Sequence, residues 1–429
     1  MEAEIIDFLE HLPSGLTVVH DDIPSVGTTA LAFFIRVGSR DESPSEWGCA
    51  HLLEHLLFKG AGTFDQGAIA RQMDKLGGDV NAFTTRDYTC FHARVLDSES
   101  LTAYQLLKAL VNEPWLRGED LAREKNVVLE EMRESQDDPD DVVDLLLTDA
   151  LYADSAYSHD ILGTAQSLDE IDMKSVSTFF HKHYRPCNMV FAVSGGATRQ
   201  VLEALSLDFS RPEREATESP QPFRPQLRCE SRHTVSDWEQ LHIALAVPAP
   251  GRYEASYYSA LIAASILGGQ NSSRLWQRLR EEEGLVYTVG TQYAAEWGFG
   301  EMTTYLSLGP RYVERALEVL GRELRRLGEE GPDLAEMERT CTSLFTMLVM
   351  GLETPDSRVL RLGRYGLDQR VPSRLGLVRE GLLAVDAKAI QDQAKRWLNF
   401  DNMAKAWAGP QGPRINGIAD DLRRGIENG

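Results

Sequence analysis

The chain has 429 residues, of which 42% are hydrophobic and 26% charged, and its formal net charge is -22. This length exceeds one typical hydrophobic core and predicts two or three domains, while the acidity argues against nucleic acid or an anionic membrane as a partner. The sequence contains no run of 18 apolar residues, so no transmembrane helix is predicted. The acidic N-terminus does not resemble a signal peptide, and five scattered cysteines without a CxxC pair predict a reducing, cytoplasmic location.

The first half of the chain predicts strands mixed with helices. Residues 28–39 are rich in β-branched and aromatic residues and predict a strand, and residues 48–58 have helical spacing. Residues 65–78 predict a helix that ends at two glycines, and residues 79–95 predict a hairpin around a turn-like TTRD. Further elements are expected as helices at about 98–112 and 118–135 and a strand at 188–196.

A proline-rich and charged stretch divides the chain near its middle. Residues 211–230 have few aliphatic residues, and their composition is typical of a linker. We therefore expect an N-terminal domain at 1–210 and a C-terminal domain at 231–429.

The two halves resemble each other weakly. The strand predicted at 240–250 is similar to the early strand of the first half, and residues 120–141 resemble residues 333–357. Both of these longer segments predict a long helix followed by a proline-bearing turn. The pattern predicts an α+β fold of two duplicated sandwich-like domains, each an antiparallel sheet packed with helices. If Glu124 is aligned with Glu338, Glu131 falls opposite Phe345, and the second half has no His-x-x-Glu-His, so the ionisable cluster is expected only once.

The segment AHLLEHLLFKG carries three ionisable groups among leucines. His51 and His55 are four residues apart, so an α-helix places both on one face with Glu54 beside them. Two imidazoles at this spacing can bind one Zn²⁺, and an unpaired buried glutamate would be costly. The alternative is a helix whose polar groups are satisfied by hydrogen bonds.

A zinc site of this type needs more than two histidines. Catalytic zinc usually has three protein ligands and an open position for water, whose pKa falls to about 7. The third ligand must therefore come from elsewhere in the chain. Glu54 is placed to act as a general base rather than as a ligand.

The HLLEH sequence resembles the inverted motif of the pitrilysin family of zinc peptidases, in particular the short two-domain type similar to mitochondrial processing peptidase subunits and bacterial homologues. In that family the third ligand is a glutamate some 75 residues downstream, with another glutamate seven residues before it. The resemblance implies that Glu131 is the third ligand and that Glu124 supports the site. Glu130 points about 100° away from Glu131 on a helix, so only one of the two can face the metal.

The resemblance extends to the hairpin and to the second half. It implies that a peptide substrate adds as a strand to the hairpin, with Asn81 and Ala82 at its backbone and Phe83 lining a pocket. The alternative is an ordinary hairpin with Phe83 in the core. It also implies that Arg280 and Tyr287 contact the substrate and stabilise the tetrahedral intermediate. The alternative is that Arg280 only forms a surface ion pair and that Tyr287 is an ordinary half-buried tyrosine.

We interpret the chain as a zinc metalloendopeptidase with one Zn²⁺ per chain, acting on unfolded peptides or on short leader and extension peptides. We expect a clamshell-type homodimer in which Arg280 and Tyr287 act on the partner's zinc site, with a heterodimer with a paralogue as another possible assembly. One alternative is a non-catalytic or partner-dependent peptide-binding subunit. Another is a structural zinc protein, although structural sites normally have four ligands.

Overall fold

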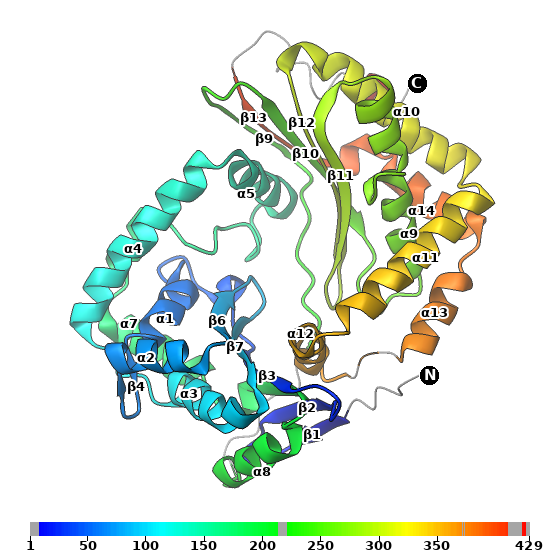
Figure 1. Ribbon diagram of the computed structural model, residues 1–429. Coiled ribbons are helices and arrows are strands. Elements are labelled where there is room, and N and C mark those ends of the chain that lie inside the picture. The colour runs from blue at the N-terminus through cyan, green and yellow to red at the C-terminus, as the bar shows by residue number, and fades with distance from the viewer. Residues whose placement is uncertain (1–7, 213–220, 371, 373, 411–422, 426–429) are drawn as a thin grey trace. The chain divides into compact units, whose positions relative to one another are not determined.

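The computed structural model describes residues 8–212, 221–370, 372, 374–410 and 423–425 (Figure 1). The chain divides into two compact units. Unit 1 contains Met1–Met132, His159–Gln221 and Leu348–Leu375, and unit 2 contains Arg133–Ser158, Pro222–Met347 and Gly376–Gly429. Part of the predicted linker, residues 213–220, lies outside the described residues. Among the helices of the described ranges, none combines the length and the apolar composition needed to cross a bilayer.

Unit 1 is built on a six-stranded sheet with the order β1-β2-β8-β3-β7-β6. All neighbouring strands are antiparallel except β2 and β8, which are parallel. The strands are β1 (Phe8–His11), β2 (Thr17–Asp22), β3 (Thr28–Ile35), β6 (Asp79–Thr84), β7 (Thr89–Leu96) and β8 (Met189–Gly195), with a separate pair β4 (Gly60–Ala61) and β5 (Phe64–Asp65). β6 forms one edge of the sheet, so no strand of the described residues pairs with its outer side.

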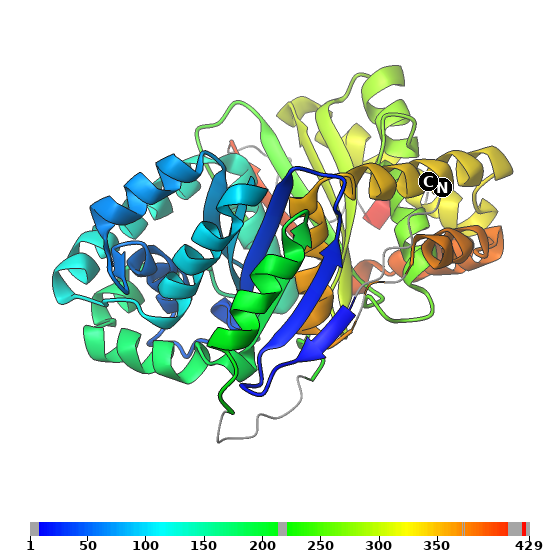
Figure 2. The ribbon, with the colours of Figure 1, turned by 60° about the horizontal axis from the view of Figure 1, so that its bottom comes forward.

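Helices cover both faces of this sheet. One face packs on the main core of unit 1, to which α1 contributes four buried leucines and α8 contributes Val201 and Leu205. The other face packs on α12 through Val359 and Leu362. Figure 2 shows the green α8 and the golden-brown α12 on opposite sides of the blue strands. The helices of unit 1 are α1 (Cys49–Leu57), α2 (Gln66–Leu76), α3 (Ser100–Asn112), most of α4 (Gly118–Asp137), α6 (Ala165–Glu170), α7 (Met173–His183), α8 (Thr198–Asp208) and α12 (Pro355–Leu367).

Unit 2 repeats this design with a five-stranded sheet of order β11-β12-β10-β13-β9. Its only parallel pair is β9 with β13, in the place that corresponds to β2 and β8. The strands are β9 (Ser231–Val235), β10 (Leu241–Ala249), β11 (Val286–Ala295), β12 (Gly300–Leu308) and β13 (Ala404–Gly409). The helices are α5 (Pro139–Tyr152), α9 (Tyr257–Gly268), α10 (Val313–Glu330), most of α11 (Leu334–Gly351), α13 (Leu375–Leu383) and α14 (Ala387–Trp397). The common strand order confirms the predicted fold of two duplicated α+β units.

Each half of the chain also lends one helix to the other unit. α5 follows α4 after a break at Asp138 and packs on the sheet of unit 2, on the face formed by Ala244 and Ala406. α12 follows α11 in the same way and packs on the sheet of unit 1. The prolines expected in turns, Pro139 and Pro355, instead begin these helices. Proline is favoured there because the first helical N–H has no intrahelical partner. The compact units therefore differ from the linear halves by these exchanged segments.

Two glycines let α12 approach the sheet of unit 1 closely. A Cβ at Gly363 would overlap the ring of Phe34, and one at Gly366 would lie 2.7 Å from Cγ1 of Val190. Phe34 and Val190 are fully buried, so neither can move into solvent.

We expect Gly363→Ala to lower the free energy of unfolding by about 1–3 kcal/mol, because added volume in a packed interior forces neighbours apart. Gly376→Ala is a matched control on α13, where a Cβ meets nothing within 4 Å. There the same change should stabilise the protein by up to about 1 kcal/mol through helix propensity. Thermal denaturation of both variants measures the difference, and equal midpoints would contradict the packing described here.

Candidate metal centre and its surroundings

Helix α1 presents three ionisable side chains from a largely buried segment. Leu52, Leu53 and their neighbours one turn later are fully buried in the core of unit 1. His51 and His55 lie on one face, as their spacing predicts, and their ring centroids are 4.7 Å apart. The leucine positions thus fix the rotation of the helix about its axis, and with it the direction in which the imidazoles point.

The structure brings Glu131 of α4 to these two histidines. Its carboxylate oxygens lie 3.9 Å from Nε2 of His51 and 3.6 Å from Nε2 of His55. One candidate ligand atom from each of the three residues lies within 4.8 Å of the others. Two ligands bound tetrahedrally at about 2.1 Å from zinc are about 3.4 Å apart, so the observed separations are close to those of a zinc site. Among the described residues, no other group of this kind is found.

Two atoms of this group are buried without a hydrogen-bond partner in the described structure: Oε2 of Glu131 and Nδ1 of His51. A buried carboxylate oxygen without a partner is costly, and a cation beside it removes that cost. Burial, with a smaller contribution from His55, lowers the pKa of His51 to about 4. His51 is therefore neutral at pH 7, the form that binds zinc. The residues present thus fit a zinc ion held by His51, His55 and Glu131.

Glu124 orients His55 from the side opposite to Glu131. Its Oε2 lies 3.3 Å from Nδ1 of His55, and its Oε1 lies 2.9 Å from Nζ of Lys59. A carboxylate on one imidazole nitrogen holds the proton there and leaves the other nitrogen as a ligand. Lys59 was not among the residues predicted from the sequence. It lies just after the end of α1, four residues after His55.

Glu54 lies beside the metal group without being one of its three members. The residue is 9% exposed, and its Oε2 accepts a hydrogen bond of 2.6 Å from Oγ1 of Thr84. Burial raises the pKa of Glu54 and nearby Glu131 adds to this, while the Thr84 hydrogen bond and His55 oppose it. A raised carboxylate pKa suits a general base that later returns its proton. No signal in the sequence marked Thr84.

A buried glutamate fixes the beginning of α1. Glu42 accepts hydrogen bonds from the backbone N–H groups of Gly48 (2.8 Å) and Ala50 (2.6 Å), which satisfies donors that no helix can satisfy internally. Nε2 of His159 lies 3.3 Å from the same carboxylate, and the His159 ring stacks on Trp47. This arrangement anchors the helix that carries the metal group. It depends on contacts between distant parts of the chain, so the sequence could not reveal it.

The three residues predicted to bind substrate lie on the edge strand β6. Asn81 is exposed and its Oδ1 accepts a hydrogen bond of 2.9 Å from the backbone N–H of Ala82. Ala82 packs partly on the main core, whereas Phe83 lies on the other face of the sheet. The ring of Phe83 is 6.0 Å from that of Tyr88 and 5.9 Å from that of His92. Phe83 is thus partly buried in an aromatic group.

Arg280 and Tyr287 belong to unit 2. Arg280 lies on a π-helix (Trp276–Glu282), with its guanidinium 4.5 Å from the centroid of the Trp276 ring, and it donates a hydrogen bond to the backbone carbonyl of Tyr287. Tyr287 is 61% exposed and stands at a register shift in the edge strand β11. Both polar groups are therefore positioned near solvent, with Arg280 held by an aromatic ring.

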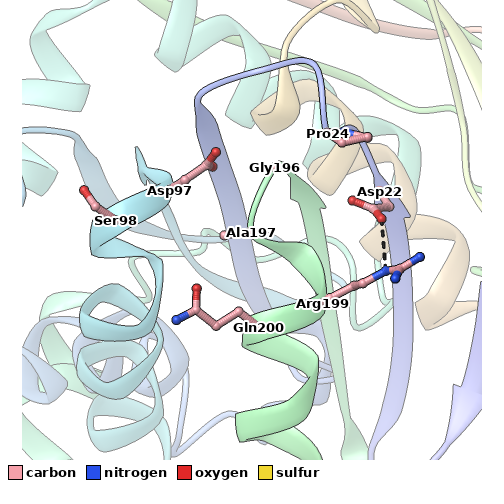
Figure 3. Close-up of a pocket in the computed structure, with 8 residues that line it drawn as sticks. All are labelled: Asp22, Pro24, Asp97, Ser98, Gly196, Ala197, Arg199 and Gln200. Carbon is pink, nitrogen blue, oxygen red and sulfur yellow. Dashed lines mark ion pairs between the residues drawn. The ribbon is translucent and has the colours of Figure 1, made fainter.

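A polar pocket of ≈ 640 Å³ lies elsewhere in unit 1, beside the start of α8 (Figure 3). Asp22 and Arg199 form an ion pair across part of it, at 3.4 Å. None of the residues predicted for the metal group or the substrate strand lines it. Its lining residues are Asp22, Pro24, Asp97, Ser98, Gly196, Ala197, Arg199 and Gln200.

Three single substitutions test the metal group. We expect Glu131→Gln to weaken zinc binding by at least about 100-fold and Glu124→Gln by about 10-fold, because the first removes a ligand and the second removes the group that orients one. Glu130→Gln is the matched control, since Glu130 is an exposed neighbour on the same helix. Competition with a chromophoric chelator measures the affinities. A loss in the Glu130 variant equal to that in the Glu131 variant would contradict the assignment.

Both halves of the chain match models of known protein families. A family model described as Insulinase (Peptidase family M16) matches residues 17–165, which include the whole metal group. A second model, described as Peptidase M16 inactive domain, matches residues 170–344, which include Arg280 and Tyr287.

Relatives and solved structures cover most of the chain. It is 30% identical to the uncharacterized zinc protease YmxG of Bacillus subtilis, over 93% of this chain and 97% of that protein. It is 34% identical to an uncharacterized zinc protease of Mycobacterium tuberculosis, over 83% of each. A protease from Helicobacter pylori has a similar fold, with a TM-score of 0.86 and 19% identity over 94% of this chain and 99% of that one. The resemblance inferred from the HLLEH motif is confirmed, and the chain belongs to peptidase family M16.

Proposed function

We propose that this protein is a zinc-dependent endopeptidase with Glu54 as its general base. The observation that carries the proposal is the group of His51, His55 and Glu131 with Glu54 beside it, in a chain whose relatives are named zinc proteases. The single group of this kind among the described residues supports one zinc ion per chain.

The chemistry assigned to each residue follows from its position. Bound zinc would act as a Lewis acid that polarises a peptide carbonyl and makes water more acidic. Glu54 takes a proton from the attacking water and later passes it to the nitrogen of the leaving peptide. His51, His55 and Glu131 hold the metal, and Glu124 with Lys59 keeps the His55 ring in the orientation that presents Nε2.

The edge strand β6 supports a proposal for how a peptide binds. Within the described part of the chain no strand pairs with its outer side, so an extended peptide can pair with its backbone. Asn81 and Ala82 would meet the substrate backbone, and the Ala82 N–H now held by the Asn81 side chain would become available when that side chain turns away. Phe83 would contribute a wall of a side-chain pocket. Because the peptide must be extended, unfolded chains and short leader or extension peptides are the proposed substrate class.

Arg280 and Tyr287 complete the proposal. A guanidinium and a phenol can donate hydrogen bonds to the oxyanion of the tetrahedral intermediate. We infer that the protein works as a clamshell homodimer, in which these two residues act on the metal site of the partner. A heterodimer with a paralogue would use the same geometry.

Two other functions are less well supported. A non-catalytic peptide-binding subunit has no need for a base, yet Glu54 is present and buried beside the metal group. A structural zinc site would normally have four protein ligands, and three are found among the described residues.

Glu54→Gln separates the base from the metal site. We expect the variant to bind zinc as the wild type does, but its kcat/KM should fall by about 10²–10⁴-fold, because the amide cannot take a proton. Cleavage of an unfolded peptide and zinc content are measured side by side. Loss of zinc from the variant would show that Glu54 supports the metal, and the mechanism would be wrong.

Mixing two inactive variants tests the dimer. Glu54→Gln lacks the base and Arg280→Ala lacks the oxyanion donor. If Arg280 acts across subunits, a mixed two-fold dimer contains one complete site, and a random mixture should recover about a quarter of wild-type activity. If it acts within its own chain, the mixture should be no more active than the two variants measured separately.

A further inference from the structure

Thr84 connects the proposed general base to the proposed substrate strand. It is the last residue of β6, and its hydroxyl donates the hydrogen bond of 2.6 Å to Oε2 of Glu54 on α1. We propose that Thr84 is a positioning residue that sets the carboxylate of Glu54 relative to a peptide bound on β6. This inference rests on the proposed peptidase function and assigns a role in it to a residue outside the predicted site.

The hydrogen bond restricts the Glu54 side chain beyond the restraint that its fixed backbone supplies. The backbone of Glu54 is fixed, because α1 is packed on the core through its leucines and anchored at its beginning by Glu42. Its carboxylate lies three rotatable bonds further out. The hydrogen bond from Thr84 is made to Oε2. A carboxylate that is already ordered loses less conformational entropy on reaching the transition state, so the entropy cost of the reaction is smaller.

The donor itself is rigidly placed. The hairpin pairs Thr84 with Thr89 of β7, a fully buried residue. The turn that follows is closed by Thr85, whose N–H bonds to the carbonyl of Tyr88 at 2.8 Å and whose hydroxyl accepts from the Tyr88 N–H at 3.0 Å. The Thr85 carbonyl in turn accepts from the N–H of Ser39 at 3.2 Å. The backbone is therefore held by hydrogen bonds on both sides of Thr84, and this fixes the position from which its hydroxyl projects.

The same strand would carry the substrate. Asn81 is three residues before Thr84, which is about 10 Å along a strand. A peptide paired with this strand takes its register from the backbone that also places the Thr84 hydroxyl. The peptide and the carboxylate of Glu54 would thus both be positioned by β6. The hydrogen bond from Thr84 would fix the position of this carboxylate relative to the bound peptide.

Thr84→Val and Thr84→Ser test the inference. Valine keeps the shape and the β-branch of threonine but has no hydroxyl, whereas serine keeps the hydroxyl. We expect Thr84→Val to lower kcat about 10–100-fold with KM changed less than about twofold, because a displaced base impairs the chemical step and not peptide binding. Zinc content and melting temperature should stay at wild-type values. Thr84→Ser should retain kcat within about threefold of the wild type.

Two controls separate positioning from a structural role. Thr17→Val removes another strand hydroxyl of unit 1, one that contacts His11 at 3.3 Å and not the metal group, and should leave kcat unchanged. In the Glu54→Gln background, Thr84→Val should change the residual rate less than about twofold, because no base remains to be positioned.

The outcomes distinguish this inference from the proposed function. An active wild type with an equally active Thr84→Val variant overturns the inference alone. So does a loss that appears in KM or zinc content, or one that serine fails to restore. A zinc-loaded wild type that cleaves no unfolded peptide overturns both the proposed function and the inference.

Discussion

The metal group depends on the placement of charged side chains against a hydrophobic core. Helix α1 buries its leucines in the core and also carries two partly buried imidazoles and the buried carboxylate of Glu54. The opposing helix α4 brings a carboxylate whose Oε2 is buried without a hydrogen bond. Such groups are costly unless a cation or a donor meets them. Glu42, Glu124 and Thr84 each meet a polar group of α1, and Lys59 meets the carboxylate of Glu124.

These surrounding residues share the task of holding a few atoms in place. Glu42 fixes the start of α1, Glu124 with Lys59 fixes one imidazole, and Thr84 fixes one carboxylate oxygen. Each acts through a charged or charge-assisted hydrogen bond in a partly dehydrated setting, where such bonds are stronger than in water. The metal group is therefore built from rigid parts contributed by a helix start, a second helix and a strand end.

The duplication places this chemistry in one copy only. Both sheets share a strand order and the position of their parallel pair, yet the candidate metal-binding group is found only in unit 1 among the described residues. Phe345, the counterpart of Glu131 in the sequence alignment, packs on the core of unit 2 instead. In unit 2 the notable polar residues, Arg280 and Tyr287, lie at its own edge strand. One fold thus supports two different surfaces once the ionisable residues of one copy are replaced by apolar ones.

The amino-acid sequence alone predicted the helix at 48–58, the hairpin at 79–95 and two candidate metal ligands, because these follow from local periodicity and spacing. It also indicated the duplication, since repeated segments must form similar elements. The choice of Glu131 over Glu130 needed a family pattern, and the contacts of Thr84, Lys59 and Glu42 were decided only by the tertiary structure. Their partners lie 30, 65 and 6 or 8 residues away in the chain. Contacts of this kind depend on how elements pack, and no periodicity within a single element records them.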